Sequence, residues 1–132
     1  MISRSAPRLA GFCGAILIAA IAADSLVPVA WQVRLGLHWL VEHFLAYFTV
    51  TMIFCLALPR PFVVAGMLMV LPAIMEALQS LTADRIPDLP TALSGAAGAW
   101  SGAIMANLLL RVLRRRKAAH PDVPAVAQPP QM

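Results

Sequence analysis

The chain has 132 residues, of which 61% are hydrophobic and only 12% are charged. This composition is too apolar for a water-soluble domain, so it excludes a soluble protein and predicts a membrane protein. The formal net charge of +4 comes from basic residues that lie between and after the apolar segments. Nucleic-acid binding would need a folded basic surface or interleaved aromatic residues, and the basic run at 114–117 has neither.

Four segments are apolar enough and long enough to cross a bilayer, whose hydrocarbon core requires about 20 apolar residues per helix. In chain order, we expect helices over approximately Leu9–Leu26, Leu35–Leu58, Phe62–Leu81 and Thr91–Val112. Pro28 and the breaker Pro59–Pro61 separate the first three segments, because proline cannot donate the helical hydrogen bond. Short connections make consecutive helices antiparallel neighbours. The predicted fold is therefore all-α: an integral membrane up-and-down bundle of four transmembrane helices.

The prediction divides the chain into an N-terminal segment at residues 1–8, a four-helix membrane domain at 9–112 and a tail at 113–132. The tail begins with the basic run Arg114–Lys117, and few large apolar residues follow. It also contains four prolines: Pro121, Pro124, Pro129 and Pro130. Such a segment cannot bury enough apolar surface to fold, so we expect it to be disordered.

The basic residues predict the orientation, because those that flank hydrophobic segments are retained on the cytoplasmic side. With the N-terminus inside, only Arg34 and Arg85 lie outside. All the others then lie in the cytoplasm: Arg4, Arg8, Arg60, Arg111, Arg114, Arg115, Arg116 and Lys117. Both termini are therefore predicted to be cytoplasmic.

The first apolar segment has a second interpretation. Arg4 and Arg8, the apolar stretch after them and Ala20–Ala22 also match a cleaved signal peptide. The later helices keep the same orientation in either case, so both interpretations stay open.

Ionisable side chains are costly within membrane helices and usually face a partner or a water-filled cavity. On the predicted orientation, the polar groups within the helices fall in the outer half: Asp24, Glu42, His43, Glu76 and Gln79. At about 1.5 Å per residue, Glu42 and His43 lie about 10 to 12 Å from the outer end of their helix, and Glu76 about 7 to 8 Å from its own. Two interpretations follow: a polar pocket open to the extracytoplasmic side, or structural hydrogen bonds that fix helix packing.

Residue spacing extends this polar cluster. Tyr47 shares a helical face with His43, and Gln79 shares one with Glu76. Arg34 and Arg85 are placed to neutralise the carboxylates from the loops. We therefore predict a ligand-binding pocket from these side chains: Asp24, Glu42, His43, Tyr47, Glu76, Gln79 and Arg85.

We expect no metal, cofactor or disulfide. Cys13 and Cys55 both lie in apolar segments, without the spacing of a metal site or a disulfide framework. His38 and His43 are five residues apart, about 140° around a helix, so they cannot share a metal as histidines at i and i+4 do.

The last apolar segment carries small residues along a stripe: Ser94, Gly95, Gly98, Ser101 and Gly102. Small residues let helix backbones approach closely. We expect Ser94, Gly95, Gly98 and Gly102 to pack within the monomer, with a dimerisation face as the alternative, so an oligomer is left open.

Three stretches within residues 25–102 together resemble the VanZ-like family, named for a teicoplanin-resistance protein of glycopeptide-resistance gene clusters. Ser25–Pro28 is similar to the family's serine, apolar pair and proline after its first helix. Glu42–Phe48 has the histidine, phenylalanine and tyrosine at the family's spacing. The most specific stretch is Glu76–Gln79, followed by the loop residue Arg85 and the glycines of the last helix.

The chain departs from the family pattern at two places. Members often carry an Asp-Lys pair shortly before the histidine, where this chain has Trp39 and Leu40. They also commonly carry an Asp and an Asn in the last motif, where it has Thr91 and Gly95. These departures leave open whether an activity that needs those side chains is retained.

The resemblance implies a multi-pass bacterial inner-membrane protein of the cell envelope and, for some members, reduced sensitivity to lipid-interacting glycopeptides. It implies no settled reaction. Our main hypothesis is a non-enzymatic binding or accessory protein that receives a lipid-linked or polar envelope molecule, with membrane lipids as its other partners and no nucleic acid.

Two other function classes remain as alternatives. One is a membrane enzyme in which Glu42, His43 or Glu76 acts as general acid or base on a lipid-linked substrate. The other is a small four-helix proton-coupled drug exporter, which would need a carboxylate near the membrane midplane.

Overall fold

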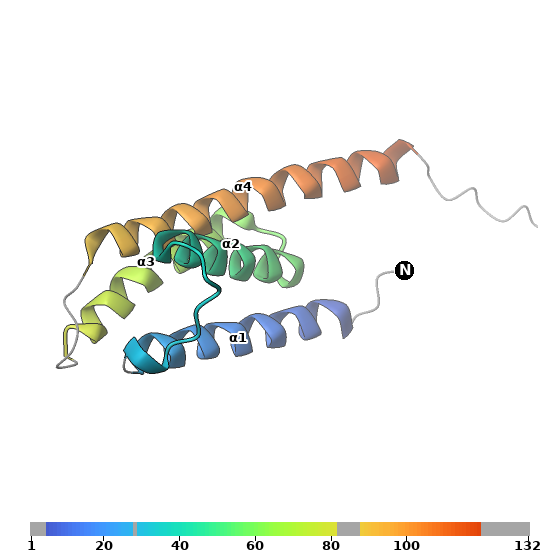
Figure 1. The fold of residues 1–132 in the computed structure, drawn as a ribbon. Helices are drawn as coiled ribbons and strands as arrows, with labels where there is room; N and C mark the ends of the chain where they lie inside the picture. Colours follow the sequence, from blue (N-terminus) through green and yellow to red (C-terminus); the bar gives the residue numbers. More distant parts are fainter. Residues whose placement is uncertain (1–4, 28, 82–87, 120–132) are drawn as a thin grey trace, which may run out of the picture.

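The computed structural model describes residues 5–27, 29–81 and 88–119, which form four α-helices and a short 3-10 turn (Figure 1). In chain order these elements are α1 (Ser5–Leu26), η1 (Val29–Trp31), α2 (Trp39–Ala57), α3 (Pro61–Gln79) and α4 (Leu89–Ala119). The described part of the chain contains no strand. All four helices are long and apolar enough to cross a membrane. The predicted all-α bundle of four membrane-spanning helices is confirmed.

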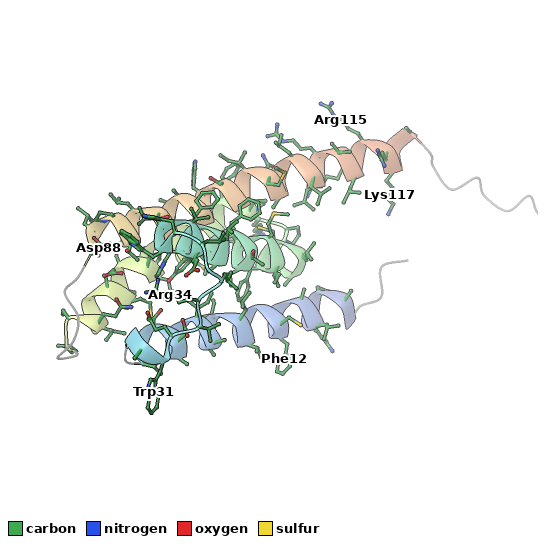
Figure 2. The ribbon with its side chains drawn as sticks, viewed as in Figure 1. Phe12, Trp31, Arg34, Asp88, Arg115 and Lys117 are labelled. Atoms are coloured by element: carbon green, nitrogen blue, oxygen red, sulfur yellow. The ribbon has the colours of Figure 1, made fainter. Side chains whose placement is uncertain are left out.

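The helices run alternately up and down, which places two groups of charged residues at opposite ends of the bundle (Figure 1). At the end that we call the acidic end, α1 and α3 finish while α2 and α4 begin, close to Asp24, Glu42, Glu76 and Asp88. The other end, called the basic end, carries Arg8, Arg60, Arg111 and the run Arg114–Lys117. In Figure 2, Arg34 and Asp88 lie toward the acidic end, and Arg115 and Lys117 lie at the basic end.

Helix α2 begins later than predicted, at Trp39 instead of Leu35. Gly36 has a φ of +79°, a left-handed conformation that a helix does not accept and that glycine adopts without steric cost. His38 is the N-cap, and its side chain accepts a hydrogen bond from the N–H of Leu40. The four residues before Trp39 therefore belong to the α1–α2 connection (residues 29–38) and not to the membrane span.

Helix α4 ends later than predicted, at Ala119 instead of Val112. Residues 113–119 are thus helical and not disordered, which corrects the predicted tail in this part; residues 120–132 lie outside the described residues. Leucine, arginine, lysine and alanine are strong helix formers, and the basic side chains of the last turn interact favourably with the helix dipole. With 31 residues, α4 is about 46 Å long and extends beyond a hydrocarbon core of about 30 Å.

The buried core lies where α2, α3 and α4 meet. Val50 and Thr51 of α2 and Ala99 of α4 are completely buried, and Val64 and Leu68 of α3 complete the cluster. Helix α1 packs on α2 and more lightly on α3, and its described residues make no contact with α4. Its aromatic side chain Phe12 points away from the bundle (Figure 2). The molecule is therefore a tight three-helix unit with one more loosely attached helix.

Candidate functional site

Small residues on α4 bring it into direct contact with the backbone of α2. A Cβ atom added at Gly98 would collide with the backbone carbonyl of Phe44, and one at Gly102 would lie 2.7 Å from the carbonyl oxygen of Phe48. The hydroxyl of Ser94 donates a 2.6 Å hydrogen bond to the carbonyl oxygen of Leu40. The small-residue stripe is thus occupied within the monomer.

Gly95 extends the same contact to a third helix. A Cβ atom at this position would lie 2.8 Å from the Pro72 side chain of α3 and 2.9 Å from the Tyr47 ring of α2. Because Gly95 has no side chain, the Tyr47 ring is held between α2 and α4 and is only 2% exposed. The α2–α4 contact therefore fixes the position of a predicted pocket residue.

The carboxylate of Asp24 attaches the α1–α2 connection to the end of α1. Its Oδ1 accepts a 2.9 Å hydrogen bond from the backbone N–H of Val33. The side-chain amide of Gln32 donates a 3.1 Å hydrogen bond to the backbone carbonyl of Asp24. This carboxylate thus has a structural role beside any role in binding.

Glu42, in the first turn of α2, holds the other half of the same connection. Its Oε1 accepts hydrogen bonds from the N–H groups of Leu35 at 2.8 Å and Leu37 at 3.2 Å. Its Oε2 lies 3.8 Å from Nη1 of Arg34. The predicted neutralisation of a carboxylate by Arg34 is therefore present in the structure, and it acts on Glu42.

Glu76 of α3 fixes the start of α4. Its Oε2 accepts a 2.8 Å hydrogen bond from the backbone N–H of Asp88. Asp88 in turn precedes α4, and its Oδ2 accepts a 2.6 Å hydrogen bond from the hydroxyl of Thr91 and a 3.4 Å one from the indole N–H of Trp39. Gln79 donates a 3.0 Å hydrogen bond to the carbonyl of Ser25, which joins α3 to α1. The acidic end is thus a hydrogen-bonded layer that involves all four helices.

Glu42 and Glu76 lie closer to their helix ends than we predicted, whereas Asp24 lies near the end of α1 as expected. Asp24 is two residues before the end of α1, Glu42 is three residues after the start of α2, and Glu76 is three residues before the end of α3. At about 1.5 Å per residue, each lies within about 5 Å of its helix end. The greater depth predicted for Glu42 and His43 was wrong because α2 starts at Trp39.

Two polar side chains of α2 retain groups without a hydrogen-bond partner among the described residues. Nδ1 of His43 lies 2.9 Å from the carbonyl oxygen of Trp39. A carbonyl oxygen only accepts, so Nδ1 carries a proton and Nε2 stays free to bind another group. The hydroxyl of Tyr47 also makes no hydrogen bond within the described residues.

Two cavities adjoin at the acidic end. The first, of about 400 Å³, lies between α1, the α1–α2 connection and α2. It is lined by Leu17, Ala20, Ile21, Asp24, Ser25, Val33, Leu35, Glu42, His43, Ala46 and Tyr47. The second, of about 170 Å³, is lined by Gln32, Arg34, Trp39, His43, Glu76, Gln79, Asp88 and Thr91. His43 lines both, so it stands at the boundary between an amphipathic cavity and a smaller polar one.

The predicted pocket residues therefore divide between two adjoining spaces. Asp24, Glu42 and Tyr47 line the first cavity, Glu76 and Gln79 line the second, and His43 lines both. The predicted residue Arg85 lies outside the described residues. Sequence reasoning missed the remaining polar members of the second cavity: Gln32, Trp39, Asp88 and Thr91.

One of these omissions had a detectable signal. Asp88 precedes Thr91 by three residues just before an apolar helix, which is a pattern typical of a helix N-cap. Gln32 reaches the cavity because the α1–α2 connection folds over the bundle end, which local sequence does not encode, and Trp39 reaches it from the first turn of α2. Thr91 occupies the place where the family resemblance would put an aspartate, and it lines the second cavity.

Fold and site together define a multi-pass membrane protein with a polar, open site at one end of its bundle. Among the described residues, no group of three His, Cys, Asp or Glu side chains is placed to hold a metal ion. Comparison of the chain with protein-family models, with curated proteins and with solved structures found no match.

Proposed function

We propose that this chain is a VanZ-like protein of the bacterial inner membrane that binds an amphipathic envelope molecule without transforming it. The observation that carries the proposal is the pair of cavities that meet at His43, where apolar side chains of α1 and α2 adjoin a polar layer. Ligand sites are usually concave, mostly apolar and lined by a few placed polar groups, and volumes of about 300 to 1,000 Å³ are common. The first cavity has this character.

The cavities face the extracytoplasmic side in this proposal, and both termini are cytoplasmic. Support comes from the basic end, which gathers Arg8, Arg60, Arg111 and Arg114–Lys117, while Arg34 is the one arginine described at the acidic end. Basic residues that flank membrane spans are retained in the cytoplasm. A ligand would then enter from the outer leaflet or from the aqueous space beyond it.

Binding is favoured over catalysis because the carboxylates already have structural partners. Glu42 accepts two backbone N–H groups and faces Arg34, and Glu76 accepts the N–H of Asp88. A general base gains and loses a proton in each turnover, which would disturb the backbone segments that these carboxylates hold in place. Proton-coupled export is disfavoured too, since every carboxylate within the described helices lies within about 5 Å of a helix end and none is near the midplane.

Filling the first cavity tests the proposal. Ala46 lines it, so Ala46→Phe would occupy the space, whereas Ala73→Phe places the same side chain on the exposed face of α3. In a bacterium that expresses the protein, we expect the wild type and Ala73→Phe to lower sensitivity to a teicoplanin-type glycopeptide and Ala46→Phe to lose this effect. Identical sensitivities for all three proteins at equal membrane levels would contradict the proposal.

A further inference from the structure

We infer that the ligand is a single-chain amphiphile with a cationic ammonium head, and not one with a phosphate head. The inference rests on the proposed function and specifies the ligand class of the same site. The first cavity has an apolar part formed by Leu17, Ala20 and Ile21 of α1 and Ala46 of α2. Asp24, His43 and Tyr47 line its polar part toward the acidic end. A space of about 400 Å³ with one apolar and one polar part suits one alkyl chain whose head lies among the polar groups.

The charge of the described lining residues decides the sign of the head. Four carboxylates line the two cavities, from Asp24, Glu42, Glu76 and Asp88, against the single guanidinium of Arg34. That guanidinium already faces Glu42. Charges in a medium of low dielectric constant interact strongly, so an anionic phosphate would be repelled and a cation attracted.

Free acceptor positions remain for such a cation. Oδ2 of Asp24 and Oε1 of Glu76 make no hydrogen bond with any described residue, while the other oxygen of each carboxylate holds a backbone N–H. In the tautomer with its single proton on Nδ1, Nε2 of His43 is also a free acceptor. An ammonium group has three N–H donors and no acceptor, so it matches this set of acceptors.

Tyr47 gives an independent indication that a polar group belongs in the cavity. Its side chain is 98% buried, since only 2% is exposed, and it lines the first cavity. Its hydroxyl nevertheless has no hydrogen-bond partner among the described residues. Among the described residues no buried side-chain oxygen lacks a partner, so this oxygen is open to the cavity and can bond to a group placed there. An amine head in the cavity would donate to this hydroxyl oxygen.

The test compares three probes that share a decyl chain: decylamine, decyl phosphate and decyl glucoside. Binding is measured to the full-length protein in lipid nanodiscs, and nanodiscs that carry Ala46→Phe give the background from partition into lipid. We expect decylamine to bind at least about tenfold more tightly than decyl phosphate. Glu76→Gln, which keeps an acceptor for Asp88, should weaken decylamine several-fold and leave decyl glucoside unchanged.

Tyr47→Phe supplies the second variant. The hydroxyl of Tyr47 makes no hydrogen bond with the described residues, so its removal should leave the unfolding temperature unchanged. We expect decylamine binding to weaken several-fold. If decyl phosphate or decyl glucoside bound more tightly than decylamine after subtraction of the Ala46→Phe background, the inference of an ammonium head would be wrong. The proposed binding function would still stand. No binding above that background for any probe would overturn both proposals.

Discussion

Helix α2 packs against α4 and against α1 in two very different ways. On the α4 side, Gly98 and Gly102 let the helix backbones touch, and the neighbouring residues Val50 and Ala99 are completely buried. On the α1 side, a cavity of about 400 Å³ lies between the two helices. Without a hydrophobic driving force in lipid, helices associate through close packing and interhelical hydrogen bonds. The α2–α4 contact therefore forms the frame of the molecule, and α1 forms one wall of the site.

The ties of α1 to the bundle reinforce this difference. Toward the basic end, Gly14 accommodates the ring of Phe54, a side chain that can move. At the acidic end, Gln79 donates to the carbonyl of Ser25, and Asp24 holds Val33. Between these two levels lies the cavity. A ligand chain could therefore enter with small movements of α1, while the α2–α4 frame stays fixed.

The largest effect is expected from a single methyl group in the α2–α4 contact. Gly98→Ala places a Cβ atom against the backbone carbonyl of Phe44, which cannot move without separating the helices. We expect a loss of about 3 kcal/mol of unfolding free energy, the upper range for overpacking. Unfolding in detergent, followed by size-exclusion chromatography after heating, measures it.

The matched control for that change is Gly66→Ala, because a Cβ atom at Gly66 on α3 has nothing within 4 Å. It should be neutral or stabilising by up to about 1 kcal/mol, since alanine is the better helix former. Equal unfolding temperatures for the two variants would contradict the assignment of α2–α4 as the frame.

A smaller effect is expected at the α1–α2 connection. Glu42→Ala leaves the N–H groups of Leu35 and Leu37 without their acceptor and Arg34 without its ionic partner. An unsatisfied group costs about 1 to 3 kcal/mol when buried, and these are exposed, so we expect about 1 kcal/mol. Faster amide hydrogen exchange at Leu35 and Leu37 is the direct readout. Glu42→Gln keeps a side-chain oxygen and should preserve most of the protection; unchanged exchange in Glu42→Ala would refute the structural role.

Removal of one interhelical hydrogen bond should have a still smaller effect. Ser94→Ala deletes the bond to the carbonyl of Leu40, and such bonds in membrane proteins contribute about 0.6 kcal/mol on average. Ser101→Ala is the control, because Ser101 also lies on α4 but its side chain makes no hydrogen bond with any described residue. Unfolding temperatures of the two variants are compared. A larger loss for Ser101→Ala would show that the bond to Leu40 is not what matters.

The smallest effect on stability is expected from the largest added side chain. Ala46→Phe inserts a ring into the space between α1 and α2, so the unfolding free energy should change by less than about 0.5 kcal/mol. The unfolding free energies of Ala46→Phe and Gly98→Ala are measured side by side in detergent. If the ring destabilised the protein more than the methyl group at Gly98, the α1 side would be the tighter contact and our comparison would be reversed.

The membrane class, the number of helices and their alternating order could be predicted from the amino-acid sequence, because hydropathy and helix length act locally along the chain. The sequence also placed the polar residues near one level of the bundle and selected Ser94, Gly95, Gly98 and Gly102 as packing residues. Helix ends were predicted less well. Helix α2 does not begin before Trp39, because Gly36 has a left-handed conformation and Glu42 accepts hydrogen bonds from the N–H groups of Leu35 and Leu37. The Glu42 carboxylate thus acts on residues outside its own helix, which a local sequence pattern does not reveal.

The roles of the polar residues, in contrast, depend on how the helices pack. Asp24, Glu42 and Glu76 each hold a backbone segment outside their own helix, 5 to 12 residues away, and Tyr47 reaches the cavity because Gly95 leaves room for its ring. The division into two cavities that adjoin at His43 likewise follows from the path of residues 29–38 over the bundle end. Hydrogen bonds and cavities depend on the relative positions of whole helices, which packing sets and local sequence patterns do not.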